Sequence, residues 1–423
     1  MFNFRRLRGM GGGDGRVITM NYCGLSESEV SAVRPTPVPW TAPGRTDKLA
    51  RSGEIELTFA GLTTLGVGGK VAQLVKATSE TEIIAAVRSA DAADTAVLML
   101  GGGSNLVPQD GEFAGVVVLD MRRGITLIED TACGGATVVV PGGHPWDDFV
   151  CEAISRGWAG PEALSGIPGC VGAAPVQNIG AYGAEVAEFI SQVIVWDRAE
   201  NRRRTLVRSE LKLGYRSSIL KDSMTDPVAG GGRTWGPTGR YIVLEVVFQM
   251  AHATRSEPVR YTQLADALGV QVGERVSSIK LREAVLQLRR SKGMVVDGAD
   301  PDSRSAGSFF TNPILPLSGA DSLPEGAPRF PVEKRALANP VTGQSPLAPN
   351  LVKTSAAYLI SAAEITRGFA LENSGAAVSS KHVLALTNRG GATAEEVRIL
   401  AKYVANRVHE RFGIALHPEP VYL

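Results

Sequence analysis

The segment that most constrains the fold is "LSGIPGCVGAAPVQNIGAYGAEV", residues 164–186. Small residues dominate it, and its glycines can adopt φ > 0 and let backbone N–H groups approach a ligand closely. Two more glycine-rich segments lie upstream, "LGVGGKV" (65–71) and "LGGGSNLV" (100–107). A single segment of this kind is more often a tight turn. Several of them in one region favour a common binding site.

Neither of the two common nucleotide-binding motifs fits these segments. Lys70 follows Gly69, but the earlier glycine and the following Ser or Thr of a P-loop are missing. No segment combines a strand, GxGxxG and a helix with an acidic residue downstream, which argues against a Rossmann domain.

A ligand with both a diphosphate and a large flat ring system would explain why several glycine segments are needed, and FAD has both. The amides in the segments can read polar atoms of the ring or ribose, and their compact apolar residues can pack on a ring. The predicted FAD-binding residues are Gly101, Gly102, Gly103, Ser104, Asn105, Gly166, Ile167, Pro168, Gly169, Gln177, Asn178, Gly180 and Ala181.

The composition limits the partners. Lys+Arg is 44 and Asp+Glu is 43, so no overall charge attracts nucleic acid or an anionic membrane. The four cysteines are scattered, with neither a CxxC pair nor a metal-binding spacing, so we expect no metal and a reducing, cytoplasmic location. No apolar run is long enough to span a membrane. Nothing in the sequence specifies an oligomer, and a monomer is expected.

The chain divides into three parts. Residues 1–55 are rich in Gly, Pro, Arg and Ser without periodicity, which predicts a disordered extension, with Met20 as an alternative start. Residues 57–250 alternate short β-branched runs with a helix over 145–160, an α+β pattern. Residues 255–423 have longer helices and form a second, smaller α/β domain. We expect a loop insertion at 223–240 and an irregular connection at 314–350.

Helix signals are clear in the second part. "SSIKLREAVLQLRRSKG" (277–293) has leucines at helical spacing. Thr393 and Glu396 have the spacing of a capping box, and Gly413 follows the helix that they begin. A strand is expected just before it, at 382–388.

Eight strings in a fixed order resemble one known family. They are "TTLGVGG", "GGGSNLV", "LSGIPGCVGAAPVQNIGAYGAEV", "LGYRSSILK", "RRSKGMVVD", "SAGSFFTNP", "SSKHVLALTNRGGATAEEV" and "LHPEPV". Together they are similar to the UDP-N-acetylenolpyruvoylglucosamine reductases over residues 57–423. The resemblance implies an FAD-binding domain of the vanillyl-alcohol-oxidase (PCMH) type and a smaller substrate domain. It also implies reduction of UDP-N-acetylglucosamine-enolpyruvate to UDP-N-acetylmuramate by NADPH, for peptidoglycan synthesis.

The resemblance assigns three catalytic residues. Ser308 of "GSFF" matches the family's proton donor, Arg216 of "GYRSS" its arginine, and Glu419 of "LHPEPV" its glutamate. After hydride addition to the methylene carbon, the carbon next to the substrate carboxylate must accept a proton, which a positioned, dry hydroxyl can give. The planar guanidinium of Arg216 would bind the substrate carboxylate through two N–H groups. Glu419 would act as an acid and stabilise the enol-like intermediate by a hydrogen bond. Without the family match, both charged residues would more often be exposed.

The resemblance also assigns Tyr261, Lys292 and Asn312 to the UDP portion of the substrate, and Tyr215 is a further expected substrate-binding residue. Tyr182 is expected near the flavin or the substrate, or in the seam between the domains. By itself, a lysine at the position of Lys292 is more often a charge that complements a helix C-terminus.

Three positions depart from the family or suggest alternatives. His417 stands in the C-terminal motif and is expected to be exposed, and Tyr358 replaces a common tryptophan in the core. His144 follows two glycines, as in oxidases that tether flavin covalently, but after a different strand, so non-covalent FAD is expected. An oxidase of the same flavin fold, or a nucleotide-sugar-binding regulator without catalysis, are the alternative functions.

Overall fold

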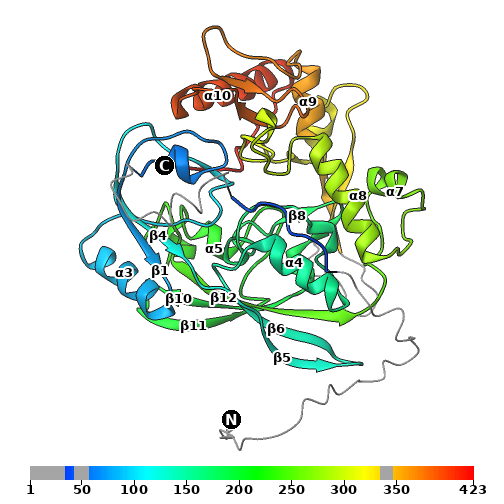
Figure 1. The fold of residues 1–423 in the computed structure, drawn as a ribbon. Coiled ribbons are helices and arrows are strands. Elements are labelled where there is room, and N and C mark those ends of the chain that lie inside the picture. Colours follow the sequence, from blue (N-terminus) through cyan, green and yellow to red (C-terminus); the bar gives the residue numbers. More distant parts are fainter. Residues whose placement is uncertain (1–33, 42–56, 334–345) are drawn as a thin grey trace, which may run out of the picture.

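The computed structural model describes residues 34–41, 57–333 and 346–423 of the chain. Most of the extension predicted over 1–55 lies outside the described residues. Residues 34–41 differ from that prediction, because they pack against the body of the protein through hydrogen bonds described below. They form the dark blue segment that crosses the middle of Figure 1.

An antiparallel sheet forms the centre of the first part, with strand order β11-β10-β12-β6-β5. Apolar side chains point to alternate faces along β10 (Ile190–Asp197), so this strand packs against a hydrophobic core on each side. Val193 and Val195 pack on one side, while Ile194 and Trp196 pack on the other. The other strands are β5 (Thr126–Thr131), β6 (Gly135–Pro141), β11 (Arg202–Val207) and β12 (Tyr241–His252), with β7 (Trp158–Ala159) paired to the end of β12.

A parallel sheet of three strands covers one face of this antiparallel sheet, in the order β1-β4-β2. Its strands are β1 (Val71–Ala77), β2 (Val97–Met99) and β4 (Phe113–Asp120), and helix α3 (Glu80–Ala92) packs on it. Ser79 caps α3 by accepting a hydrogen bond from the Glu82 N–H.

The opposite face of the antiparallel sheet is covered by α4 (Trp146–Ser155) and the glycine-rich segment 164–186 (Figure 1). Pro145 is the N-cap of α4 rather than part of its first turn. This segment contains only short elements, because its many glycines and prolines favour turns. The short elements of the first part are α2 (Phe59–Leu62), β3 (Leu106–Val107), η2 (Glu162–Leu164), η3 (Val171–Ala173), β8 (Gly180–Ala181), β9 (Ala184–Glu185), η4 (Val186–Glu188), α5 (Ile219–Asp222) and α6 (Pro227–Gly230).

The second part contains the longer helices that the sequence predicts. Helix α8 (Ser278–Ser291) packs with α7 (Thr262–Leu268), and α10 (Ala394–Phe412) lies with α9 (Ala356–Ala362) at the top of Figure 1. Thr393 and Glu396 form the predicted capping box. The strand before α10 is shorter than predicted, β17 (Leu386–Asn388), and pairs with β16 (Ala376–Val378).

Two predicted irregular regions contain regular structure. The loop insertion at 223–240 includes α6, whose N-cap Asp226 accepts from the Val228 N–H. The stretch 314–350 contributes to a three-stranded antiparallel sheet, in which Pro316 and Pro331 take strand positions opposite Leu351 and Val352. Its elements are β13 (Ile314–Pro316), η6 (Leu317–Ser322), β14 (Phe330–Glu333) and β15 (Leu347–Lys353); η5 (Pro301–Ser303) precedes them.

The C-terminus returns to the first part. β18 (Val421–Tyr422) pairs in parallel with β3 and so brings the "LHPEPV" motif beside the "GGGSNLV" loop. The predicted division between 57–250 and 255–423 stays a prediction. None of the helices in the described ranges is long and apolar enough to cross a membrane.

Candidate active site

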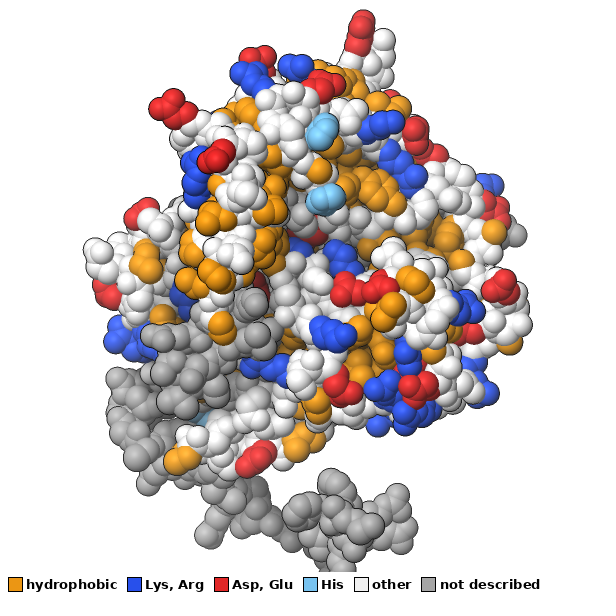
Figure 2. Space-filling model, turned by 180° about the vertical axis from the view of Figure 1, so that it is seen from behind, with side chains coloured by type: hydrophobic (Ala, Val, Ile, Leu, Met, Phe, Trp, Pro, Cys, Tyr) orange, Lys and Arg blue, Asp and Glu red, His pale blue; other side chains and the backbone are white. Residues whose placement is uncertain are grey.

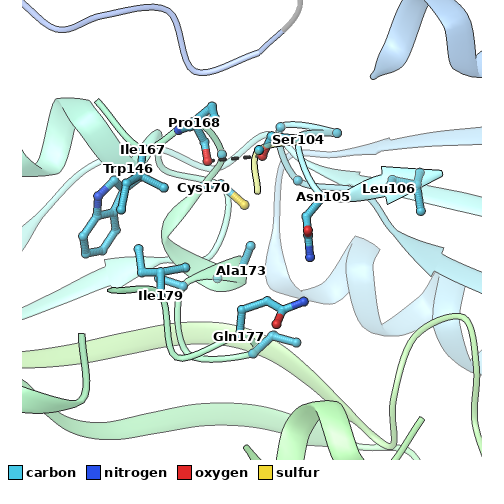
Figure 3. A pocket seen from close by; sticks show the side chains of 18 of the residues that line it. Ser104, Asn105, Leu106, Trp146, Ile167, Pro168, Cys170, Ala173, Gln177 and Ile179 are labelled. Atoms are coloured by element: carbon cyan, nitrogen blue, oxygen red, sulfur yellow. Dashed lines mark hydrogen bonds between the residues drawn. The ribbon is translucent and has the colours of Figure 1, made fainter. Parts of the chain in front are cut away.

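A cavity of about 680 Å³ lies where the two parts meet, and residues from both line it. Figure 2 shows the molecule hollowed between its upper and lower regions, with basic side chains beside the hollow. Figure 3 shows the part formed by the glycine loops, where Ser104 and Asn105 face Ile167, Pro168 and Gln177 across the space. Ser104 Oγ donates to the Pro168 carbonyl at 3.2 Å and links the two loops.

The glycines of these loops are required by close approach and by conformation. A Cβ on Gly102 would lie 2.7 Å from Gly169 Cα, and one on Gly101 would lie 2.8 Å from Cys170 Sγ. Gly103 and Gly169 have φ of +67° and +119°. The glycines therefore let the loops pack closely together and form a cradle whose backbone lines the cavity, and this fits the close approach that a cofactor diphosphate needs.

Most of the predicted site residues line this one cavity. They are Gly101, Gly102, Gly103, Ser104, Asn105, Ile167, Pro168, Gly169, Gln177, Gly180, Ala181, Tyr182, Arg216, Tyr261, Lys292, Ser308 and Glu419.

Four predicted residues do not line it, because their polar groups are used elsewhere. Gly166 donates its N–H to Asp147. The Asn178 amide bonds to Glu185, to the Gly214 carbonyl and to the Ala187 N–H, and its side chain is buried. The Tyr215 hydroxyl accepts from the Asn312 N–H, and the Asn312 side chain accepts from the Ala356 N–H. Direct ligand contact by these four therefore stays a prediction.

Arg216 and Glu419 meet in the cavity wall. Arg216 Nε lies 3.0 Å from Glu419 Oε1, an ion pair in which the N–H does not point along the hydrogen-bond direction. The same guanidinium donates to the carbonyls of Gly180 at 2.7 Å and Asn178 at 3.4 Å. Burial is the largest single influence and lowers the pKa of Arg216, but the charge of Glu419 and the smaller contributions of Tyr215 and Glu185 together outweigh it, so the pKa is raised.

Two amides that were predicted to read the flavin also hold Glu419. Asn105 Nδ2 and Gln177 Nε2 donate to the Glu419 carbonyl at 3.4 and 3.2 Å. Lys221 Nζ in turn donates to Gln177 Oε1 at 3.0 Å, and burial lowers its pKa. These bonds fix the C-terminal segment against the cofactor loops.

Ser308 lies on the chain segment next to Glu419. Gly307, with φ of +74°, precedes it, and Phe309 and Phe310 are fully buried behind it. The Glu419 N–H donates to the Phe309 carbonyl at 2.9 Å, so the two segments run side by side. Within the described part of the chain the Ser308 hydroxyl has no hydrogen-bond partner, which leaves it available to a ligand in the cavity.

The opposite end of the cavity carries basic and aromatic groups. Lys292 Nζ donates to Gln263 and lies 5.7 Å from the centre of the Tyr182 ring, which packs edge-on against Tyr261. Burial, and then the charge of Arg289, lower the pKa of Lys292. Lys292 is also the C-cap of α8, as its alternative interpretation predicts.

Among the lining residues that sequence reasoning missed are Trp40, Arg289 and His382. Arg289 lies one helical turn before Lys292, a spacing that could have revealed it. Burial lowers the pKa of His382 to about 4, with the Lys292 charge adding to the effect. Trp40 reaches the cavity from the N-terminal segment, and no motif in the surrounding sequence predicted this.

His144 is held outside this lining. Its Nδ1 accepts from the Gly124 N–H at 3.2 Å, and its buried Nε2 has no partner among the described residues. Burial lowers the pKa of His144 to about 4, with Arg123 contributing. His417 is exposed, as predicted. The described residues contain no group of His, Cys, Asp and Glu that could hold a metal ion.

The fold and the glycine cradle define a flavoprotein, and a family model described as FAD binding domain matches residues 71–204. A second model, UDP-N-acetylenolpyruvoylglucosamine reductase, C-terminal domain, matches residues 300–423. The chain is 46% identical over 370 residues to the reductase of that name from Cutibacterium acnes, covering 87% of this chain and 90% of the relative. It is 44% identical over 368 residues to the one from Thermobifida fusca, covering 86% and 96%. The chain belongs to the UDP-N-acetylenolpyruvoylglucosamine reductase family.

A solved structure supports the fold. The UDP-N-acetylenolpyruvylglucosamine reductase from Thermus caldophilus aligns with a TM-score of 0.53 at 22% identity, over 87% of this chain and 98% of that one. The predicted fold class is thereby confirmed: an α+β protein with an FAD-binding domain of the PCMH type and a smaller C-terminal domain.

Proposed function

We propose that this flavoenzyme reduces the enolpyruvyl ether of UDP-N-acetylglucosamine-enolpyruvate to UDP-N-acetylmuramate, a peptidoglycan precursor, with NADPH as reductant. The observation that carries the proposal is that Arg216, Ser308 and Glu419 line one cavity with the glycine loops. The names of the curated relatives support the substrate class.

FAD is held in this proposal by backbone groups of the loops at 101–105 and 167–169, with Gly180 and Ala181 nearby. When bound, FAD supplies the hydride that adds to the methylene carbon of the substrate. His144 supports non-covalent binding, because it is absent from the described lining and its Nδ1 is already bonded.

Ser308 donates the proton that the carbon next to the substrate carboxylate must accept. Its hydroxyl faces the cavity between Gly307 and the buried phenylalanines, which keep that side of the site dry. Hydride and proton together account for the two hydrogens gained by the double bond.

Arg216 and Glu419 stabilise the charge that develops on the carboxylate. A substrate carboxylate on the Arg216 fork would compete with Glu419 for the guanidinium. Glu419 released from this pair lies within the same wall and, once protonated, can donate a hydrogen bond to the enol-like intermediate. The bonds from Asn105 and Gln177 to its carbonyl keep it positioned during this exchange.

The nucleotide portion of the substrate is assigned to Tyr182, Tyr261 and Lys292, with Arg289 as an additional cation. NADPH uses the same cavity in turn. Tyr215 and Asn312, which bond to each other outside the lining, position the "SAGSFFTNP" segment rather than contact substrate. We further propose that the enzyme works in the cytoplasm as a monomer.

The experiment is an aerobic assay that follows NADPH, oxygen and the mass of the sugar nucleotide. The proposal expects NADPH oxidation to require the enolpyruvyl substrate, and one hydride plus one proton to appear in the product. Oxygen consumption without any UDP-sugar would instead indicate an oxidase of the same fold. Binding of UDP ligands by a colourless protein would indicate a regulator.

A further inference from the structure

Residues 34–41, here called the strap, connect to both parts of the protein at a buried ion pair. Asp147 in α4 and Arg282 in α8 are joined by two contacts of 2.7 Å, and their side chains are 1% and 2% exposed. Asp147 also accepts from the Val38 N–H at 2.7 Å, and Arg282 donates to the Thr36 carbonyl at 2.9 Å. A buried ion pair needs such additional hydrogen bonds to offset desolvation, so the strap completes the pair.

Beyond this anchor, the strap binds both glycine loops of the cofactor cradle. The Trp40 carbonyl accepts from the Gly169 N–H at 2.8 Å, and the buried Thr41 hydroxyl donates to the Gly102 carbonyl at 3.0 Å. A Cβ on Gly102 would lie 2.5 Å from the Trp40 oxygen. The absence of a side chain at Gly102 is therefore needed for the strap as well as for the loop.

Trp40 itself lines the cavity, next to a cation. The guanidinium of Arg123 lies 5.3 Å from the centre of the Trp40 ring, and both residues belong to the cavity wall. Arg123 is also tied to the loop after β6 by a hydrogen bond to the Gly143 carbonyl. An aromatic face with a neighbouring cation is suited to the dinucleotide part of a flavin cofactor.

We infer that the strap is part of the cofactor site, where it covers the glycine loops and places Trp40 against bound FAD. This inference rests on the proposed binding of FAD in the cradle. We expect the strap to stay in place when the cofactor binds, since its anchor residues Asp147 and Arg282 are not in the cavity lining. Its effect is to slow release of FAD.

The test compares FAD binding by full-length variants. Trp40→Ala removes the ring. Val38→Asp places a carboxylate beside Asp147, at a position that is 8% exposed and packs on Leu286 and Val295, and so detaches the whole strap. The control Tyr403→Ala removes an aromatic ring of α10 that is not in the cavity wall. Titration of apoprotein gives the dissociation constant, and recovery of free-flavin fluorescence gives the release rate.

We expect Trp40→Ala and Val38→Asp each to raise the dissociation constant and the release rate about tenfold or more, the effect of losing one well-packed aromatic contact. Trp40→Phe should restore most of the loss, and Tyr403→Ala should match the wild type. Release rates equal to the wild type in both strap variants would overturn the inference. So would tighter or faster binding, because the strap would then compete with FAD. A wild-type protein that takes up no FAD would instead overturn the proposed function.

Discussion

Arg216 combines the conformational strain and the charge that the proposed chemistry needs. Its φ of +53° is unfavourable for a residue with a side chain, and hydrogen bonds from its guanidinium to the Gly180 and Asn178 carbonyls fix the side chain. Strained residues of this kind are concentrated at functional sites. The ion pair with Glu419 links Arg216 to a second proposed catalytic residue.

Replacing Arg216 by Lys keeps the positive charge but removes the planar fork. We expect kcat/KM for the enolpyruvyl substrate to fall by about a hundredfold or more, since a bidentate site does not accept Lys as a conservative change. Reduction of the flavin by NADPH should change much less. A variant with normal kcat/KM would show that the fork does not bind the substrate carboxylate.

Replacing Ser308 by Ala separates the two half-reactions. Flavin reduction by NADPH should remain intact, while reoxidation by substrate should slow by about 10²–10⁴-fold, the usual contribution of a positioned acid. Stopped-flow absorbance measures both steps. Ser305→Ala is the matched control, because Ser305, whose hydroxyl accepts from the Gly307 N–H, is not itself in the cavity lining. Equal slowing of both half-reactions in Ser308→Ala would count against its role as donor.

His144 makes the fold sensitive to acid. Its pKa is lowered from 6.5 to about 4 in the folded chain, so the unfolded chain binds more protons between these values. Stability conferred by the neutral ring is therefore lost as the pH falls from about 6.5 towards 4. Between pH 7 and pH 5, wild type should lose about 1–2 kcal/mol more free energy of unfolding than His144→Asn. Urea unfolding at both pH values measures this, and equal losses would contradict it.

At the scale of elements, the sequence predicted those helices and strands whose formation depends on neighbouring residues in the chain. The capping box at Thr393, the helix α8 and the strands of the antiparallel sheet all follow from periodicity and end signals. The sheet at 314–353 was missed, because its prolines stand at strand positions where pairing is set by distant partners. The glycine loops could also be predicted from local sequence. Their backbones approach one another so closely that glycine is required at fixed positions.

The loop containing Gly169 offers a test of backbone conformation alone. Its φ is +119°, yet a Cβ would have only ordinary contact with Ser104 Oγ, at 3.5 Å. Gly169→Ala should therefore leave the protein folded but re-orient the loop, with FAD content after purification at most about a tenth of normal. Gly111→Ala is the control, since nothing lies within 4 Å of its Cβ and its φ is ordinary. Full FAD content in Gly169→Ala would show that this conformation is not needed.

The contact between α4 and α8 depends on the Asp147–Arg282 pair. Asp147→Asn should lower the free energy of unfolding by about 3–5 kcal/mol, because Arg282 would be left buried without a counter-charge. Asp148→Asn is the matched control. Burial raises the pKa of Asp148, so removing its charge should cost little. Similar losses in the two variants would mean that the ion pair has no special part in stability.

At the scale of the whole molecule, the site could be predicted only in part. Residues such as Ser308 and Glu419 were assigned by motif, and the pairing of β18 with β3 brings them to the loops. The side chains of Asn178 and Asn312 bond to other parts of the fold, and a motif does not reveal which way a side chain faces, so their place in the site stays a prediction. Trp40 was missed because its position depends on an anchor more than a hundred residues away, at Asp147.

The central claim is that this one cavity transfers a hydride from NADPH to a UDP-linked enolpyruvyl ether. The most direct measurement is anaerobic: the purified protein is reduced with one equivalent of NADPH, and UDP-N-acetylglucosamine-enolpyruvate is then added while flavin absorbance is followed. The account expects the oxidised flavin spectrum to return rapidly on addition of the substrate. A flavin that stays bleached until air is admitted would contradict it.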